Sequence, residues 1–183
     1  MPDSTDIRII EEEKMNSVLD AKIRSGLCTC FPADAETFAK TRAWHGSHPD
    51  FSVILESEEG VIAHVGVVNR RIHADATPLR IAGPQNLFVI PSQRGKKLFN
   101  VVMQAAMEEA RRRRFDMGLL FCTPDLGNPY EKAGWKTVDV KHVIRVMESG
   151  KEEEIPGKNI TMYYPLLIST LETETIHLGG NDW

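Results

Sequence analysis

Residues 86–99 read Asn-Leu-Phe-Val-Ile-Pro-Ser-Gln-Arg-Gly-Lys-Lys-Leu-Phe, and this stretch decides the fold. Leu87 to Ile90 is a short apolar run of branched and aromatic side chains, which predicts a buried strand that stops at Pro91. From Leu98 onward, apolar residues recur at helical spacing, which predicts an amphipathic helix that reaches the basic residues 111–114. Its expected buried face consists of Leu98, Val101, Val102, Ala105 and Ala106. A strand therefore precedes the turn, and a helix follows it.

The turn between these two elements, residues 92–97, is suited to holding an anion. It contains no proline, so the backbone N–H groups at the start of the helix are available to a ligand. The N-terminus of a helix carries about half a positive charge, and Gly95 allows a ligand to approach the backbone closely. The side chains of Arg94, Lys96 and Lys97 add full charges. An ordinary strand–turn–helix with a solvated basic turn stays open as the alternative.

The composition is that of a single globular domain. The chain has 183 residues, of which 42% are hydrophobic and 26% charged, so one domain over residues 1–183 is expected. No run approaches the about 20 apolar residues of a membrane helix, and residues 1–6 lack the features of a secretory signal. We therefore expect a cytoplasmic protein with no membrane partner, and a homodimer stays open.

The charged residues and cysteines exclude further classes of function. A net charge of −4 argues against a nucleic-acid partner, because such binding depends on a basic face that neutralises phosphates. The three cysteines cannot all pair within the chain, and the spacing of Cys28 and Cys30 is too short for a common zinc site. Free thiols and no metal are expected.

Hydrophobic alternation and turn residues predict the remaining elements. A helix should start at the acidic residues Glu11–Glu13 and run toward Gly26, and a second helix should follow at 32–43. Glu58-Glu59-Gly60 should join a hairpin, and Gly83-Pro84 should form a bulge. We expect strands at 7–10, 51–55, 61–71, 79–90, 117–122, 138–147 and 160–167, and a short helix at 128–134.

Two strand pairings determine the expected topology. The apolar run 117–122 follows the central helix, so a crossover should place it parallel to the strand that ends at Ile90. The strands at 138–147 and 160–167 should form an antiparallel pair, separated by the polar stretch 148–158. No internal repeat is present.

The strand, turn and helix at 86–110 resemble the acyl-CoA pyrophosphate loop of the GCN5-related N-acetyltransferase (GNAT) superfamily, whose usual pattern is Gln/Arg-x-x-Gly-x-Gly/Ala. Arg94 fits its first position, whereas Lys97 stands where the pattern has a glycine and Phe99 where it has a small residue. Residues 128–135, Asn-Pro-Tyr-Glu-Lys-Ala-Gly-Trp, resemble the superfamily's second mark, Tyr-x-x-x-Gly followed by Phe or Trp. Because the two patterns agree in order and spacing, the chain is identified as a member of this superfamily.

Within the superfamily, residues 61–72, 94–98 and 182–183 are most similar to the aminoglycoside 2′-N-acetyltransferases. Residues 61–72 are also similar to the nodulation N-acyltransferases. The resemblance implies the α/β GNAT fold: a mixed, mostly antiparallel sheet with a splayed parallel pair of central strands, flanked by helices. One N-acetyltransferase domain would fill residues 1–183, with 168–183 as a C-terminal tail.

The resemblance also implies the activity, which is transfer of an acyl group, acetyl in the simplest case, to an amine by direct attack. Acetyl-CoA or another acyl-CoA would be the co-substrate, and the acceptor would be a small-molecule or peptide amine. A non-catalytic acyl-CoA-binding or regulatory module on the same fold is the alternative. Arg111–Arg114 would complement the helix dipole or contact the 3′-phosphate of CoA.

The site residues follow from the same resemblance. A backbone N–H near Phe88, Val89 or Ile90 would hold the thioester carbonyl, and Tyr130 would donate a proton to the leaving sulfur. The pyrophosphate would bind at Arg94, Gly95, Lys96, Lys97, Leu98 and Phe99, and the pantetheine at Asn128. The acceptor would contact Gln85, Asp182 and Trp183. Trp44 is expected there for another reason, because the loop 44–50 contains a tryptophan, two histidines and an aspartate; a merely exposed loop is the alternative. Gln85 stands where the aminoglycoside enzymes have a glutamate, so the base stays open among His64, His45 and a water relay.

Overall fold

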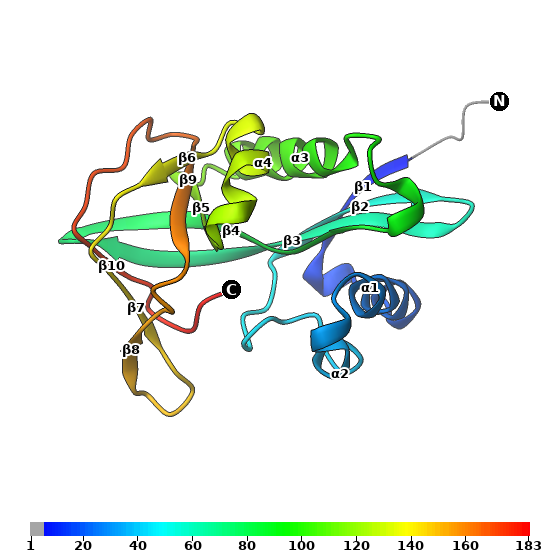
Figure 1. The fold of residues 1–183 in the computed structure, drawn as a ribbon, viewed down its shortest axis with the longest axis horizontal. Helices are drawn as coiled ribbons and strands as arrows, with labels where there is room; N and C mark the ends of the chain where they lie inside the picture. Colours follow the sequence, from blue (N-terminus) through cyan, green and yellow to red (C-terminus); the bar gives the residue numbers. More distant parts are fainter. Residues whose placement is uncertain (1–5) are drawn as a thin grey trace.

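The structure is a computed structural model that describes residues 6–183, and one curved mixed sheet forms its centre (Figure 1). The main strand order is β6-β9-β5-β4-β3-β10-β7-β8, and β2 and β1 extend the sheet beside β3. The strands are β1 Asp6–Glu11, β2 Phe51–Ser57, β3 Gly60–Ala74, β4 Thr77–Val89, β5 Met117–Cys122, β6 Lys136–Val138, β7 His142–Val146, β8 Glu152–Glu154, β9 Ile160–Pro165 and β10 Thr175–His177.

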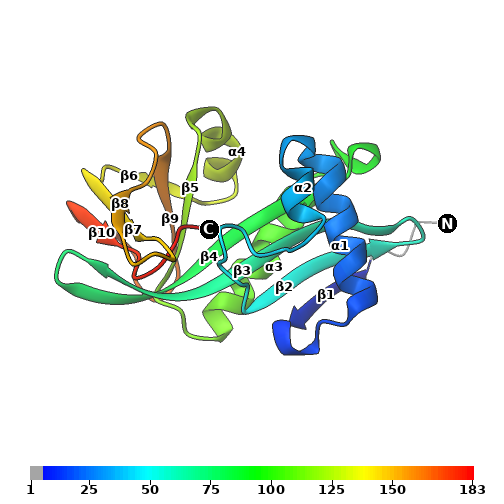
Figure 2. The same ribbon diagram turned by 90° about the horizontal axis from the view of Figure 1, so that it is seen from below.

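Helices cover both faces of this sheet, as the two views in Figures 1 and 2 show. One face carries α3 and α4, and the other carries α1 and α2. The α-helices are α1 Ser17–Cys30, α2 Ala35–Phe38, α3 Leu98–Arg112 and α4 Gly127–Lys132. Within residues 6–183, none of them has the length and apolar character that crossing a membrane requires. The expected α/β fold with flanking helices is confirmed.

The parallel pair at the centre of the sheet separates soon after it forms. β4 and β5 are paired only at Ile81–Met117 and at Ala82–Gly118. Beyond these residues β5 continues along β9, whereas β4 continues along β3. The predicted splayed parallel pair is therefore present, and an opening lies between the two strands.

The predicted hairpin of β2 and β3 is confirmed, but the predicted bulge at Gly83-Pro84 is wrong. Gly83 and Pro84 pair in register with Val68 and Val67 on β3. Val67 directs its carbonyl away from β4, to the Asp50 N–H at 2.7 Å, so Pro84 interrupts no ladder bond there.

The bulge lies a few residues later, at Asn86 and Leu87. The register shifts between the pairs Gly66–Gln85 and His64–Phe88, so that Asn86 and Leu87 oppose Val65 alone. Asn86 takes a φ of 54°, a left-handed conformation that asparagine tolerates better than most residues. The bulge turns the end of β4 away from β5.

Two predicted helices differ from the structure. Glu11 ends β1, where it pairs with Phe51, and Glu12–Lys14 form a 3₁₀ turn, so the predicted helix start at Glu11–Glu13 is wrong. The helix α1 begins after Asn16, whose side chain accepts the Leu19 N–H at 2.9 Å and caps the first turn. The predicted helix at 32–43 is wrong in length, since it consists of a 3₁₀ turn at Pro32–Asp34 and the short α2.

The predicted pairing of 138–147 with 160–167 is wrong. β9 is paired with β5 along one edge and with β6 along the other, so no free edge is left for β7. β7 pairs instead with β8, which lies in the polar stretch 148–158, and with β10. β10 belongs to the expected C-terminal tail and lies between β3 and β7, so this tail forms part of the sheet.

The helix α3 confirms the predicted strand–turn–helix, with a shifted apolar face. Val101 was expected to be buried and is 37% exposed. The side chains that pack on the sheet are Val102, Met103, Ala106, Met107 and Ala110. The methionines were not counted in the predicted face, although their spacing fits it.

Gly26 allows α1 to pack closely against Phe88 of β4, so a side chain at this position should lower the stability. A methyl group on Gly26 would overlap the Phe88 ring of β4. Replacing glycine by alanine in a helix normally stabilises by about 1 kcal/mol. We expect Gly26→Ala to lower the free energy of unfolding by about 1–3 kcal/mol instead, because overpacking outweighs that gain. Urea denaturation measures it.

The neighbouring Ser25 is exposed and gives the matched control. Ser25→Ala should leave the free energy of unfolding unchanged or raise it slightly, because only helix propensity is altered. A Gly26→Ala protein as stable as the Ser25→Ala protein would contradict the close contact of α1 with β4.

Candidate active site

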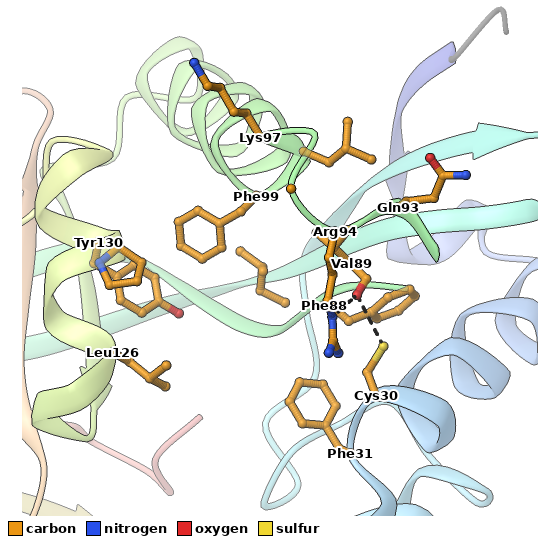
Figure 3. A pocket seen from close by; sticks show the side chains of 14 residues that line it. Cys30, Phe31, Phe88, Val89, Gln93, Arg94, Lys97, Phe99, Leu126 and Tyr130 are labelled. Atoms are coloured by element: carbon orange, nitrogen blue, oxygen red, sulfur yellow. Dashed lines mark hydrogen bonds between the residues drawn. The ribbon is translucent and has the colours of Figure 1, made fainter. Parts of the chain in front are cut away.

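Two adjoining pockets occupy the opening between β4 and β5. The loop-side pocket has a volume of about 550 Å³ and lies beside the turn before α3 (Figure 3). It is lined by Cys30, Phe31, Leu87, Phe88, Val89, Gln93, Arg94, Gly95, Lys97, Leu98, Phe99, Leu126, Pro129 and Tyr130. The tail-side pocket has a volume of about 470 Å³ and contains Trp44, Gln85 and Trp183 in its wall. Both pockets are lined by Phe31, Leu87, Leu126 and Tyr130, so they meet at these side chains.

The turn before α3 presents a run of backbone N–H groups to the solvent. Within residues 6–183, the amides from Gly95 to Phe99 donate no hydrogen bond, and the first helical bonds come from Asn100 and Val101 to the Lys97 carbonyl at 3.1 and 3.3 Å. Gly95 has a φ of 83°, and nothing lies within 4 Å of where its side chain would be. An anion can therefore approach these amides and the positive end of a 15-residue helix.

Lys97 shows why the superfamily pattern has a glycine at its position. Its backbone takes a left-handed φ of 61°, which glycine adopts freely and which costs another residue about 1–2 kcal/mol. The side chain is exposed and points away from the pocket in Figure 3. The turn therefore carries backbone strain at Lys97, where a glycine would carry none.

The other two cations of the turn lie differently. The Arg94 side chain extends into the loop-side pocket in Figure 3, and its Nε donates to the Val89 carbonyl at 3.3 Å. The Lys96 Nζ donates to Gln93 Oε1 at 2.7 Å, and Lys96 lines neither pocket. Arg94 therefore brings the positive charge that lies inside the pocket.

The end of β4 aims one amide at the opening. The Ile90 N–H donates to the Ile62 carbonyl at 3.0 Å, so it is used by β3 and Ile90 lines neither pocket. The backbone N–H and C=O groups of successive residues point to opposite sides of an antiparallel strand. Those of Phe88 therefore also point to β3, and those of Val89 point away from it. The Val89 carbonyl indeed meets Arg94 and Cys30 on the pocket side. Of the three predicted amides, that of Val89 points into the opening.

Tyr130 lies where the two pockets meet. It comes from α4, and its ring packs edge-on against Phe99 at 5.2 Å and Trp135 at 6.1 Å between centroids. Figure 3 shows its hydroxyl directed into the loop-side pocket. Burial raises the pKa of Tyr130 to about 12, with a smaller contribution from the Cys122 thiol. The phenol therefore keeps its proton at neutral pH and can donate a hydrogen bond.

The comparisons with known proteins bear on this geometry. The family model for nodulation protein A (NodA) matches residues 10–164. The chain belongs to the NodA family. This confirms the predicted relation to the nodulation acyltransferases within the GNAT superfamily, and acyl transfer from CoA to an amine is the general activity that the membership supports. No sequence among the curated proteins matches the chain.

Solved structures share the fold of this NodA-family chain. A GNAT family N-acetyltransferase (YhbS) from Escherichia coli, solved with CoA, has a TM-score of 0.70 at 15% identity and covers 98% of this chain and 92% of its own. An acyl-CoA N-acyltransferase from Pseudomonas aeruginosa has a TM-score of 0.62 at 14% identity, with 88% and 99% covered. The ribosomal-protein-S18-alanine N-acetyltransferase from Escherichia coli has a TM-score of 0.57 at 16% identity, with 90% and 97% covered.

Of the residues expected at the acceptor, Trp44, Gln85 and Trp183 line the tail-side pocket, and Asp182 does not. Gln85 is buried and holds the nearby loop, since its Oε1 accepts the Trp44 N–H at 3.2 Å and its Nε2 donates to the Ser47 carbonyl at 2.7 Å. Asp182 accepts from Arg145 at 2.8 Å and contacts His45 Nδ1 at 2.9 Å. Its charge is therefore already paired.

His64 does not fit the role of a base. Its Nδ1 lies 2.9 Å from the Asn86 carbonyl and its Nε2 3.2 Å from Ser52 Oγ, and it lines neither pocket. Burial lowers the pKa of His64 to about 4, so the ring is neutral at physiological pH. His45 is exposed and stacks on Trp44 at 4.6 Å, outside the pocket lining. The base is thus not a histidine of the pocket walls.

Asn128 and Arg111–Arg114, which were expected at the donor, line neither pocket. Asn128 is exposed and lines neither pocket, so the structure does not bring it to the site. Arg111–Arg114 lie at the far end of α3, about 22 Å from the turn at 1.5 Å per residue. There Arg113 pairs with Glu109 at 2.6 Å and with Glu11, which favours a structural role for this cluster.

Four residues that line the pockets were not predicted from the sequence. They are Cys30, Phe31, Phe38 and Phe121, which reach the pockets only through the tertiary packing of α1, α2 and β5.

The strained Lys97 generates a paired prediction. Lys97→Gly should raise the free energy of unfolding by about 1 kcal/mol, because glycine adopts a left-handed φ without strain. Lys97→Ala removes the same charge but retains a Cβ, so it should not stabilise. Thermal and urea denaturation of both variants measure the difference. Equal stabilities for the two variants would show that the backbone of Lys97 is unstrained.

Proposed function

We propose that this NodA-family chain transfers an acyl group from acyl-CoA in the loop-side pocket to an amine in the tail-side pocket, with acetyl as the simplest group. The observation that carries the proposal is the convergence of three groups on one opening. These groups are the amides from Gly95 to Phe99, the Val89 N–H and the Tyr130 hydroxyl. The structurally similar YhbS, solved with CoA, supports the choice of donor.

The loop-side pocket can hold the donor along its length. The pyrophosphate would lie on the amides of Gly95–Phe99, where the charge and the donors of a helix start coincide. The pantetheine would run between β4 and α4, along a lining that is mostly apolar. The thioester carbonyl would then accept the Val89 N–H, which stabilises negative charge on that oxygen as the amine attacks.

The reaction is a direct displacement at the thioester carbon. The amine nitrogen forms a bond to the carbonyl carbon, the carbon–sulfur bond breaks, and its electron pair leaves on the sulfur of CoA. The nitrogen loses one proton, and the sulfur gains one. The pKa of Tyr130 is raised to about 12, whereas that of a thiol is about 8.5. Tyr130 would therefore stabilise the departing sulfur by donating a hydrogen bond, while the proton from the amine ends on the thiol.

A second candidate is an acyl-CoA-binding module that performs no transfer. One observation favours it: both the oxygen and the nitrogen of the Gln85 amide bond the 44–47 loop, so no side chain replaces the glutamate of the aminoglycoside enzymes at that position. Release of CoA thiol with a panel of amines separates the two functions. Saturable binding of acetyl-CoA without any thiol release would support the module.

Tyr130→Phe tests the mechanism, because it removes the hydroxyl and keeps the ring against Phe99 and Trp135. We expect kcat with the best acceptor to fall about 10²–10³-fold, as when one donor to a transition-state charge is lost, with an unchanged Kd for CoA. The pKa of Tyr130 near 12 keeps the donor protonated between pH 6 and 9. The ratio of the two kcat values should therefore be constant over that range.

Tyr164 supplies the matched control, because it is a half-buried tyrosine on β9 that lines neither pocket. Tyr164→Phe makes the same chemical change and should leave kcat within about twofold of the parent. A Tyr130→Phe protein that matches the Tyr164→Phe protein would show that Tyr130 only packs.

A further inference from the structure

Resting on the function proposed above, we propose that His64 is a positioning residue for acyl transfer, because it holds the bulge in β4 that turns the Val89 N–H toward the thioester carbonyl. His64 lies on β3, is buried and lines neither pocket. It therefore acts through the backbone of β4 and touches no substrate. The proposal depends on the register of β4, on the conformation of Asn86 and on the partners of the His64 ring.

The register of β4 decides which amide faces the opening. The bulge at Asn86 and Leu87 adds one residue to β4, and a shift of one residue exchanges the inward and outward groups of a strand. In a ladder without the bulge, Val89 would lie opposite Ile62 and direct its N–H to β3. In the structure Ile90 donates to the Ile62 carbonyl instead, at 3.0 Å. The bulge is therefore the reason that the Val89 N–H faces the opening.

The bulge requires a strained backbone at Asn86. Its φ of 54° is left-handed, a conformation that costs free energy in residues other than glycine. Two hydrogen bonds hold Asn86 there, since its carbonyl accepts from His64 at 2.9 Å and its Nδ2 donates to the Arg42 carbonyl at 2.5 Å. The first of these bonds holds the peptide group that joins Asn86 to Leu87, so it acts directly on the backbone of the bulge.

Both nitrogens of the His64 ring have a partner, and these partners fix the tautomer. Nδ1 faces the Asn86 carbonyl, which can only accept, so Nδ1 carries the proton and donates. Nε2 then accepts from the Ser52 hydroxyl, 3.2 Å away. The ring also stacks on Phe88 at 5.6 Å between centroids. His64 thus contacts the first residue of the bulge and the residue that precedes Val89.

Leucine and asparagine at position 64 separate positioning from packing, because their side chains have the same branched shape. His64→Asn retains an N–H group close to the place of Nδ1, whereas His64→Leu has no donor. With acetyl-CoA and the best acceptor, we expect kcat to fall about 10–100-fold in His64→Leu, as when a transition-state donor is displaced, and to stay within about fivefold of the parent in His64→Asn. The Kd for CoA should be unchanged in both variants, because the pyrophosphate would bind the separate amides of Gly95–Phe99.

The amide resonance of Val89 gives a readout that packing alone would not change. In ¹H–¹⁵N spectra of the parent, this resonance should move further downfield with acetyl-CoA than with CoA, because only acetyl-CoA has the thioester carbonyl that accepts the bond. His64→Asn should behave like the parent. In His64→Leu the two ligands should shift the resonance equally, since the N–H no longer points at the carbonyl.

Ser52→Ala is the matched control, because it removes the partner of the other ring nitrogen in a fully buried site. It leaves the bond from His64 to Asn86 in place. We expect kcat within about threefold of the parent and an unchanged response of Val89, even where the lost hydrogen bond lowers the free energy of unfolding. Urea denaturation measures that free energy for all three variants. A loss of kcat in Ser52→Ala equal to that in His64→Leu would overturn the proposal.

Other outcomes also decide it. A His64→Leu protein with the kcat and the Val89 response of the parent would overturn the role of His64 and leave acyl transfer intact. Equal losses in folded His64→Leu and His64→Asn proteins would overturn it as well, because the N–H group would then have no effect. If neither variant folds, ¹⁵N spectra of the histidine rings of the parent decide: a proton on Nδ1 of His64 supports the proposal, and a proton on Nε2 rejects it.

Failure of the proposed function is distinguishable from failure of this role. A parent that binds acetyl-CoA but releases no thiol with any amine rejects acyl transfer. The response of Val89 to acetyl-CoA then still shows whether His64 directs that amide. A parent that does not bind acetyl-CoA rejects the proposed function and the role of His64 together.

Discussion

The loss of hydrogen bonding between β4 and β5 is the constraint on which the rest of the structure depends. The two strands pair at Ile81–Met117 and Ala82–Gly118 and then follow different partners. Trp183 lies at the point of separation, where its ring covers Gly83 on β4 and its Nε1 donates to the Leu119 carbonyl on β5 at 3.3 Å. The indole thereby satisfies a backbone group that the absent ladder leaves free. Both pockets exist because the strands stay apart beyond this residue.

The bulge in β4 turns the Val89 N–H toward the opening between the two strands. Asn86 and Leu87 shift the register, and His64 holds the shifted backbone through its contact with the Asn86 carbonyl at 2.9 Å. A neutral imidazole suits this place, and burial lowers the pKa of His64 to about 4. The result is a Val89 amide that faces the opening while Ile90 remains bonded to β3. A core histidine therefore positions the site without touching a ligand.

The wall of the tail-side pocket is made by segments far apart in the sequence. The Ser47 hydroxyl donates to the Asp182 carbonyl at 2.9 Å, and Asn181 Nδ2 donates to the His45 carbonyl at 3.0 Å. Arg70 adds a bond to the Asn181 carbonyl at 3.1 Å. Trp44 and Trp183 are thus presented by one hydrogen-bonded unit of two chain segments. This connection holds the two tryptophans of the pocket wall together although neither segment is a regular element there.

The sequence by itself determined the features that rest on local chemistry. The apolar run before Pro91, the helical spacing after Leu98 and the glycine at 95 were enough to predict the strand, the helix and the turn of open amides between them. Tyr130 was placed on a short helix for the same reason. The order of strand, helix and parallel strand also followed, because a crossover connection has one preferred hand and leads back to the same sheet.

Only the tertiary structure decided which strands pair and which side chains meet. β7 is excluded from β9 because β5 and β6 occupy both edges, and no pattern within 138–167 reveals that competition. Gly83-Pro84 needs no bulge, because the Val67 carbonyl opposite Pro84 accepts from the Asp50 N–H and not from β4. The bulge lies at Asn86 and Leu87 instead. Phe31, Phe121 and Trp183 line one pocket from three segments that are far apart in the sequence. Packing of distant segments is set by the free energy of the whole chain, so the local sequence does not contain it.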